Sequence, residues 1–307
     1  MNLSSKSILL IFCFSLFNLS LNAQDDLLDL AEQSSTDDAP ARSIKSFMSS
    51  RLVIGHTVET FRKGEMIIII SHRFDRLNKG AYEAFGIDDS NIRIGFEYGV
   101  SDKLSFGHGR SSSDKAYDTY VKYKLLQQKE NGFPFTATAL VGFAAKTSPR
   151  NQKADPAIGQ KEINFSFNDR IAYNSQLLIA RRFNDLFSLQ LMPTYIHKNN
   201  LAVYEIDVVN GVTNNDTFLL GVGSSVSVTK KFSVDLEYYP QMLIVTNKAY
   251  YDAFSVGFNL DTGGHVFQFH FSNSFYTNDR GSYTEVTDDF WNGDIHFGFQ
   301  IVRTFQF

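Results

Sequence analysis

Residues 106–118, FGHGRSSSDKAYD, gather side chains that could do chemistry. His108, Arg110, Asp114 and the three serines at 111–113 lie together in the sequence. A serine hydrolase needs a nucleophilic serine, a base within hydrogen-bond distance and a group that orients the base. Three serines between two long apolar segments are more simply explained as turn residues, and the chain contains no GxSxG motif. We therefore predict no catalytic residue and rank a lipid hydrolase below two non-enzymatic hypotheses, which are given at the end of this section.

The seven histidines do not predict a metal site. Only His265 and His270 lie close in sequence, and a separation of five residues places them on opposite faces of a strand. The single cysteine, Cys13, lies in a segment that we expect to be removed, so the mature chain has no thiolate ligand and no disulfide. We therefore predict no metal and no cofactor. The net charge of -4, with no basic stripe, gives no reason to expect a nucleic-acid partner.

The N-terminus predicts export. Lys6, the apolar residues 7–21 and the sequence Leu21-Asn22-Ala23 before Gln24 are typical of a cleaved signal peptide at residues 1–23. Residues 24–50 are acidic and rich in serine, and we predict that they form a disordered periplasmic leader. The leader is expected to be solvated, with binding of a periplasmic partner or plugging of a barrel as alternatives. Residues 51–307 are then the folded domain.

The folded domain is predicted to consist of about 12 strands, with a further uncertain stretch at 51–60. Most predicted strands have ten or more residues, which suits a tilted strand that crosses a membrane better than the five or six of a soluble protein. The 29 Phe and 14 Tyr are also typical of membrane-spanning β-barrels, which carry aromatic residues near both membrane surfaces. A soluble β-sandwich is the alternative, because its strands would also alternate between apolar and polar residues. The predicted strands are 66–75, 91–99, 103–111, 115–127, 133–146, 169–183, 186–197, 215–229, 232–245, 250–260, 264–275 and 293–307.

The lengths of the connections point to the same architecture. Short turns at 100–103, 128–132, 184–185, 230–231 and 261–264 alternate with mostly longer connections. Short periplasmic turns and longer outer loops are the arrangement of outer-membrane barrels. We predict an all-β, membrane-spanning, antiparallel up-and-down β-barrel in the cell outer membrane, in contact with outer-membrane lipid.

Alternation along the strands predicts which side chains face the lumen. Polar residues alternate with apolar ones, so one face of each strand meets lipid and the other a wet interior. The run Met66–Ile70 differs, because it places isoleucine on both faces and predicts apolar contact from inside. We favour a narrow or mostly occluded lumen over an open pore. The lumen-facing candidates are Arg93, Glu97, Asp118, Lys122, Lys124, Arg182, Asp235 and Glu237.

The C-terminal sequence GDIHFGFQIVRTFQF ends in a strand with large apolar residues at alternate positions. In a closed barrel the last strand pairs with the first and can end at the rim. Phe305 and Phe307 resemble the C-terminal signal that the barrel assembly machinery recognises.

Two segments, KGEMIIIISHRF (63–74) and IRIGFEYGVSDKLSFGHGRSSSDKAYDTYVKYKLL (92–126), resemble an uncharacterised family of bacterial outer-membrane β-barrels, grouped as a domain of unknown function. The resemblance extends from about residue 50 to the end of the chain, and it implies the fold and the location but no activity. If the family's motifs mark a functional surface, the candidates here are His72, Arg73 and Arg110, together with Asp118 and Lys122.

These observations lead to three functional hypotheses. The first is a non-enzymatic barrel that binds or passes a small hydrophilic solute through a narrow, mixed-charge lumen. The second is a structural or partner-docking barrel of an envelope complex, and the third is the lipid hydrolase.

Overall fold

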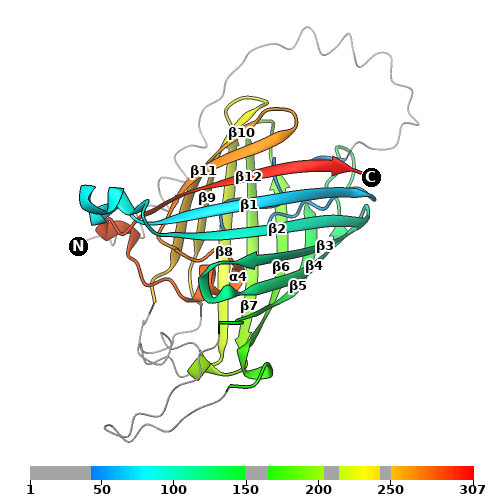
Figure 1. Cartoon of the computed structure of the whole chain (residues 1–307). Helices are drawn as coiled ribbons and strands as arrows, with labels where there is room; N and C mark the ends of the chain where they lie inside the picture. The colour runs from blue at the N-terminus through cyan, green and yellow to red at the C-terminus, as the bar shows by residue number, and fades with distance from the viewer. Residues whose placement is uncertain (1–42, 149–164, 204–213, 243–249) are drawn as a thin grey trace, which may run out of the picture. The chain divides into compact units, whose positions relative to one another are not determined.

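The computed structural model describes residues 43–148, 165–203, 214–242 and 250–307. The predicted signal peptide and the first part of the leader, residues 1–42, lie outside the described residues. Between residues 65 and 306 twelve antiparallel strands form a closed barrel, in which each strand pairs with its neighbours in sequence and β1 pairs with β12 (Figure 1). The predicted fold is confirmed.

The wall strands run from eight to twelve residues, as a tilted membrane-crossing strand requires. They are β1 (Glu65–Arg76), β2 (Ser90–Ser101), β3 (Leu104–Ser111), β4 (Tyr117–Leu126), β5 (Thr136–Ala145), β6 (Ile171–Arg182), β7 (Phe187–Lys198), β8 (Asp216–Ser227), β9 (Phe232–Tyr239), β10 (Ala253–Asp261), β11 (His265–Ser272) and β12 (His296–Gln306). The helices are η2 (Leu77–Lys79), η3 (Ala81–Gly86), η4 (Ser113–Lys115), η6 (Asn168–Arg170), η7 (Leu201–Val203), α4 (Asp279–Thr284) and η8 (Phe290–Asn292).

The two rims of the barrel differ in their connections. The connections β2–β3, β4–β5, β6–β7, β8–β9 and β10–β11 meet at one rim, which we call the short-turn rim, and both ends of the wall lie there. The connections at the other rim, which we call the long-loop rim, include residues 77–89 and 273–295. The alternation of short and long connections seen in the sequence is therefore a real difference between the two ends of the molecule.

Burial alternates along the wall as the side-chain parity requires. On β2, Arg93 and Glu97 are buried whereas Ile94 and Tyr98 are exposed on the outer face. Glycine at inward positions makes room for large side chains, since a Cβ on Gly107 would lie 2.2 Å from the ring of Tyr120. The exposed apolar side chains face outward, where lipid takes the place of a protein core.

The barrel also has an apolar core inside its lumen. Leu178, Met192 and Leu219 of the wall pack there with residues that precede β1 and with residues of the β11–β12 connection. Residues 51–60, where the sequence predicted an uncertain extra strand, contribute no strand to the wall and lie within this core. The lumen is therefore filled from both ends.

Candidate functional site

Two segments fill the lumen. Residues 43–62 enter and leave at the short-turn rim, and we call them the plug hairpin. Residues 273–295, between β11 and β12, fold in from the long-loop rim and contain α4 and η8, and we call them the cap loop. The sequence predicted that a disordered leader ends at residue 50 and that the folded domain begins at residue 51. The plug hairpin includes residues on both sides of this boundary, so residues 43–50 belong to the folded barrel.

Both arms of the plug hairpin are attached to the turns of the short-turn rim. On the first arm the Ile44 amide donates to the carbonyl oxygen of Gln128, in the β4–β5 turn, at 3.0 Å. On the second arm the Thr60 hydroxyl donates to the carbonyl oxygen of Asp102, in the β2–β3 turn, at 3.1 Å. The hairpin therefore reverses direction inside the barrel without passing through it.

The tip of the plug hairpin binds one wall carboxylate. Glu237 of β9 accepts hydrogen bonds from the amides of Val53, Ile54 and Gly55, at 3.0, 2.7 and 3.1 Å. Successive backbone N–H groups that converge in a turn form a favourable site for an anion, and charge-assisted hydrogen bonds are about twice as strong as neutral ones. Glu237 is 1% exposed, so these amides replace the water that its charge would otherwise need.

Other polar groups of the wall bind the hairpin arms in the same manner. Gln190 of β7 accepts from the Val58 amide at 2.8 Å and donates to the His56 carbonyl oxygen at 2.7 Å. The Lys122 ammonium of β4 donates to the Ser50 carbonyl oxygen at 3.1 Å and lies 3.4 Å from a carboxylate oxygen of Glu97. Side chains of the wall therefore pair with the backbone of the hairpin.

Apolar contacts account for the isoleucine run in β1. The inward side chains of Ile67 and Ile69 form a cluster with Val302 of β12, and Phe61 of the plug hairpin packs against it. The sequence predicted that an apolar group must touch this strand from inside, and Phe61 is that group.

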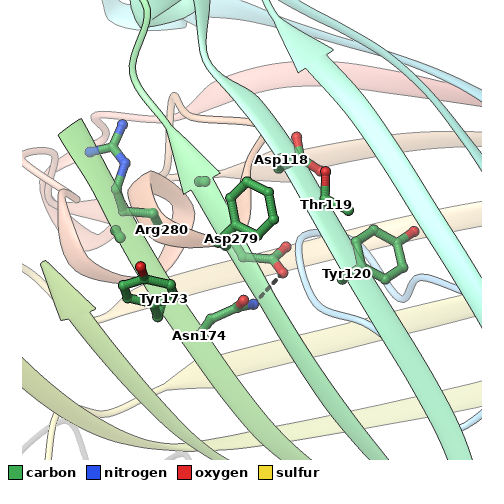
Figure 2. A pocket seen from close by; sticks show the side chains of 10 residues that line it. Asp118, Thr119, Tyr120, Tyr173, Asn174, Asp279 and Arg280 are labelled. Carbon is green, nitrogen blue, oxygen red and sulfur yellow. Dashed lines mark hydrogen bonds between the residues drawn. The ribbon is translucent and has the colours of Figure 1, made fainter. Parts of the chain in front are cut away.

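The plug hairpin and the cap loop meet at Asp279, the first residue of α4. Its carboxylate lies 3.2 Å from Arg51 Nη1 and 3.0 Å from His56 Nε2. It also accepts a hydrogen bond from the side-chain amide of Asn174 on β6 at 2.8 Å, and Figure 2 shows this contact. A cavity of about 10 Å³ lies beside it, large enough for one water molecule. We call the contact of Asp279 with Arg51 and His56 the latch.

The charges in the latch are fixed by burial and by each other. Burial, with Arg51 next to it, lowers the pKa of His56 to about 3, so the imidazole is neutral at physiological pH. Burial would raise the pKa of Asp279, but His56 and Arg51 outweigh it and hold that pKa well below its ordinary value. The latch is therefore an Arg51–Asp279 ion pair with a neutral histidine that donates from Nε2.

A buried ionic network holds the cap loop against the wall. Arg280 of α4 pairs with Glu285, and it also pairs with Asp114 of the β3–β4 connection at 3.0 Å. Lys198 of β7 lies 3.1 Å from Glu285, and Lys146 lies 2.9 Å from Asp114. Because all five side chains are buried and mutually paired, removal of one would leave an uncompensated charge in the barrel.

Most of the lumen-facing candidates lie on the inner side of the wall. Arg93 binds Asp118 through two hydrogen bonds, at 2.9 and 2.5 Å, and Asp235 accepts from Asn259 at 2.7 Å. Glu97, Lys122 and Glu237 lie further along the same surface, as described above. Lys124 and Arg182 lie at the short-turn rim, where Arg182 donates to the carbonyl oxygen of Lys45 at 3.1 Å. The structure thus assembles the candidates into wall pairs and plug contacts rather than into one pocket.

The candidates from the family motifs do not come together. Arg73 is buried and donates to the Ser274 carbonyl oxygen of the cap loop at 2.9 Å. His72 and Arg110 instead lie on the outer face, where His72 stacks on Phe299 with ring centroids 4.8 Å apart. Phe307 ends the chain with 77% of its surface exposed.

The serine and histidine of segment 106–118 also have separate partners. His108 Nδ1 lies 2.9 Å from the Thr119 hydroxyl, whereas the Ser111 hydroxyl lies 3.2 Å from that of Thr277. Within the described residues, no three His, Cys, Asp or Glu side chains gather in a group that could hold a metal ion. In the same ranges no helix is long and apolar enough to cross a membrane.

The residues that close the lumen were mostly missed from the sequence. Glu237 was proposed as lumen-facing, but Asp279, Arg51 and His56 were not singled out. Their contacts join positions more than two hundred residues apart, and none has a local motif. The one available signal was the isoleucine run of β1, which required an apolar partner without naming it.

A closed antiparallel barrel with an apolar outer face and a filled lumen defines a membrane-bound β-barrel. The chain belongs to the family described as "Membrane bound beta barrel domain (DUF5777)", whose profile matches residues 47–305. The resemblance inferred from the sequence is confirmed. The matched region begins within the plug hairpin, so the family domain includes most of the plug as well as the wall.

Solved structures of small outer-membrane channels are similar to this chain. The NanC porin is 7% identical, with 79% of this chain and 100% of that chain covered and a TM-score of 0.48. The KdgM porin is 8% identical over 78% and 99% of the two chains, with a TM-score of 0.44. The COG4313 outer membrane channel from Pseudomonas putida F1 is 12% identical over 81% and 98%, with a TM-score of 0.43. A comparison with curated proteins finds no match.

Replacement of Asp279 by asparagine is expected to destabilise the barrel, because Arg51 would remain buried without its counter-charge. Loss of one partner of a buried ion pair costs about 3–5 kcal/mol. Urea unfolding of the protein in detergent micelles measures the difference. The control is Asp88→Asn on the exposed β1–β2 connection, which we expect to change stability by less than about 0.5 kcal/mol. Equal stability of the two variants would show that the latch contributes nothing.

Acidification is expected to weaken insertion of the plug hairpin through His56. The imidazole faces Arg51, Asp279, Lys122 and the ring of Tyr120. The inserted form takes up a proton only near pH 3, whereas a withdrawn, solvated histidine does so near pH 6.5, so the insertion equilibrium weakens by about 1.4 kcal/mol per pH unit below about 6.5. Protease cleavage within the hairpin, measured from pH 7.5 to 5, should increase, and His56→Gln should flatten this dependence. An unchanged pH profile in His56→Gln would exclude the histidine as its source.

Proposed function

We propose that this membrane-bound barrel lies in the outer membrane with its short-turn rim in the periplasm, and that it is a channel closed at rest. Withdrawal of the plug hairpin toward that rim would open the lumen to a small hydrophilic solute. The observation that carries the proposal is the way the hairpin is held. Both arms leave at one rim, and wall side chains rather than a strand ladder bind the hairpin, so withdrawal leaves the barrel wall intact.

The surface behind the plug hairpin supports a hydrophilic solute. Glu237, Lys122 and Gln190 would lose their backbone partners on withdrawal and present charged and amide groups of both signs to the lumen. Gln268 and Gln300, which donate to the Leu52 and Val53 carbonyl oxygens, would join them. Such a lining replaces part of the hydration shell of a polar solute. A periplasmic partner that binds the leader would pull on the first arm and supply the force.

A structural or docking barrel is the second candidate, and one observation favours it. The hairpin side chains Leu52, Val53, Ile54 and Val58 are at most 3% exposed and belong to one apolar cluster with the wall and the cap loop. Burial of such side chains stabilises by about 1.5–3 kcal/mol each, which would keep the lumen closed permanently. The two candidates differ in whether the closed state can open.

Glu237→Gln separates these two candidates in planar bilayers. The substitution keeps the side-chain length but removes the charge that the three tip amides bind, so we expect discrete conductance steps to appear or to become at least about tenfold more frequent. Asp235→Asn is the matched control, because Asp235 lies on the same strand and face but its hydrogen-bond partners, Ser225, Ser233 and Asn259, belong to the wall. Heat-modifiable gel mobility establishes that each variant is folded.

A variant that lacks residues 46–58 completes the test, with a flexible linker of equal length in their place. If the channel proposal is right, this variant conducts continuously while it retains heat-modifiable mobility. A folded deletion variant without conductance would overturn the channel and favour the structural barrel.

A further inference from the structure

A groove of about 420 Å³ opens at the short-turn rim, outside the lumen site. It lies between the β2–β3 and β4–β5 connections and is lined by Lys103, Lys124, Leu125, Leu126, Gln127, Lys129, Gly132 and Phe133. We call it the rim groove. Its volume falls in the range of small-molecule sites, and it combines three cationic side chains with three large apolar ones.

The apolar part of the rim groove comes from an irregularity in β4. The register with β5 shifts between Lys124 and Leu126, so the strict alternation ends there. Leu125 and Leu126 are consequently both exposed, at 48% and 37%, and Phe133 across the groove is 42% exposed. Tyr123, which precedes them on the outer face, is 47% exposed. These side chains continue the lipid-facing surface of the wall into the groove.

The cationic part of the rim groove comes from three lysines, of which only Lys124 interacts electrostatically with a carboxylate of the described residues, that of Glu59. Lys103 lies in the β2–β3 turn and Lys129 in the β4–β5 turn, on opposite sides of the groove, and Lys124 lies at the end of β4 between them. Over the described ranges, the ion pairs of the structure include none of these three ammonium groups. The positive charges of Lys103 and Lys129 at a membrane rim attract an anion, and each contributes to binding at an anionic lipid surface.

We propose that the rim groove binds the phosphate headgroup of an anionic phospholipid. The phosphate would accept hydrogen bonds from Lys103 and Lys129, and the acyl chains would lie along Leu125 and Tyr123. A phospholipid fits better than an acidic peptide from solution, because the apolar wall of the groove is continuous with the surface that faces acyl chains. The inference depends on the membrane location of the barrel and not on whether the lumen opens.

The test uses a fluorescent reporter inside the groove. Phe133→Trp is introduced together with Trp291→Phe, which removes the single native tryptophan. The protein is reconstituted in phosphatidylcholine vesicles that contain a minor fraction of brominated phosphatidylglycerol or, separately, brominated phosphatidylcholine. Lipid bound in the groove quenches the tryptophan, so we expect stronger quenching by phosphatidylglycerol at equal mole fraction.

Lys103→Gln with Lys129→Gln should reduce the relative affinity for phosphatidylglycerol by roughly tenfold or more. Lys230→Gln with Lys231→Gln is the matched control, since both lysines are exposed in another turn of the same rim, and it should leave the preference unchanged. Equal quenching by the two lipids, or an equal loss in both double variants, would overturn the proposal. Displacement of phosphatidylglycerol by millimolar inorganic phosphate or by a soluble glutamate-rich peptide would also overturn it, since a free anion or an acidic protein segment would then be the ligand.

Discussion

Pairing between β1 and β12 is the contact on which the rest of the structure depends. In lipid no water is available for an unpaired N–H or C=O group, so a sheet can cross a membrane only if its last edge is joined to its first. The pairing runs from Glu65 opposite Gln306 to Arg76 opposite His296. Once this seam is closed, the outer face is committed to lipid, and the polar side chains on the inner face of the strands have to find their partners inside the barrel.

That requirement explains how the lumen is filled. A barrel of eight strands is filled by its own side chains, whereas a wider one leaves space that other groups must occupy. Here the wall's polar groups bind the backbone of the plug hairpin, as Glu237 does with the amides of residues 53–55. Apolar wall residues such as Met192 and Leu219 pack with hairpin side chains. The plug hairpin therefore completes both the hydrogen bonding and the packing of the interior.

The wall could be predicted from the sequence and the filling could not, for physical reasons. Alternation such as Ile92-Arg93-Ile94 is a local property, because adjacent residues of a strand face opposite sides whatever their partners are. The partners themselves are set by register around the closed barrel, which places Asp279 beside Arg51 and His56 without any local pattern. Residues 51–60 were considered as an uncertain extra strand because an apolar segment buried inside a barrel has the same composition as a strand of its wall. The inward isoleucines of β1 were informative because a polar lumen could not explain them.

The two inserts connect the two rims through a few buried groups. The cap loop is tied to the wall by Arg280, Glu285 and Asp114, and to the plug hairpin by Asp279. Withdrawal of the hairpin, as proposed, would separate Arg51 and His56 from Asp279 and leave its carboxylate with the Asn174 amide and the more distant charge of Arg93 on the wall. A buried carboxylate that has lost its paired counter-charge is costly. Movement of α4 away from the wall would lower this cost, because it would let water solvate Asp279. In the proposed channel, opening from the short-turn rim would therefore require a response at the long-loop rim, and closure at one rim would stabilise closure at the other.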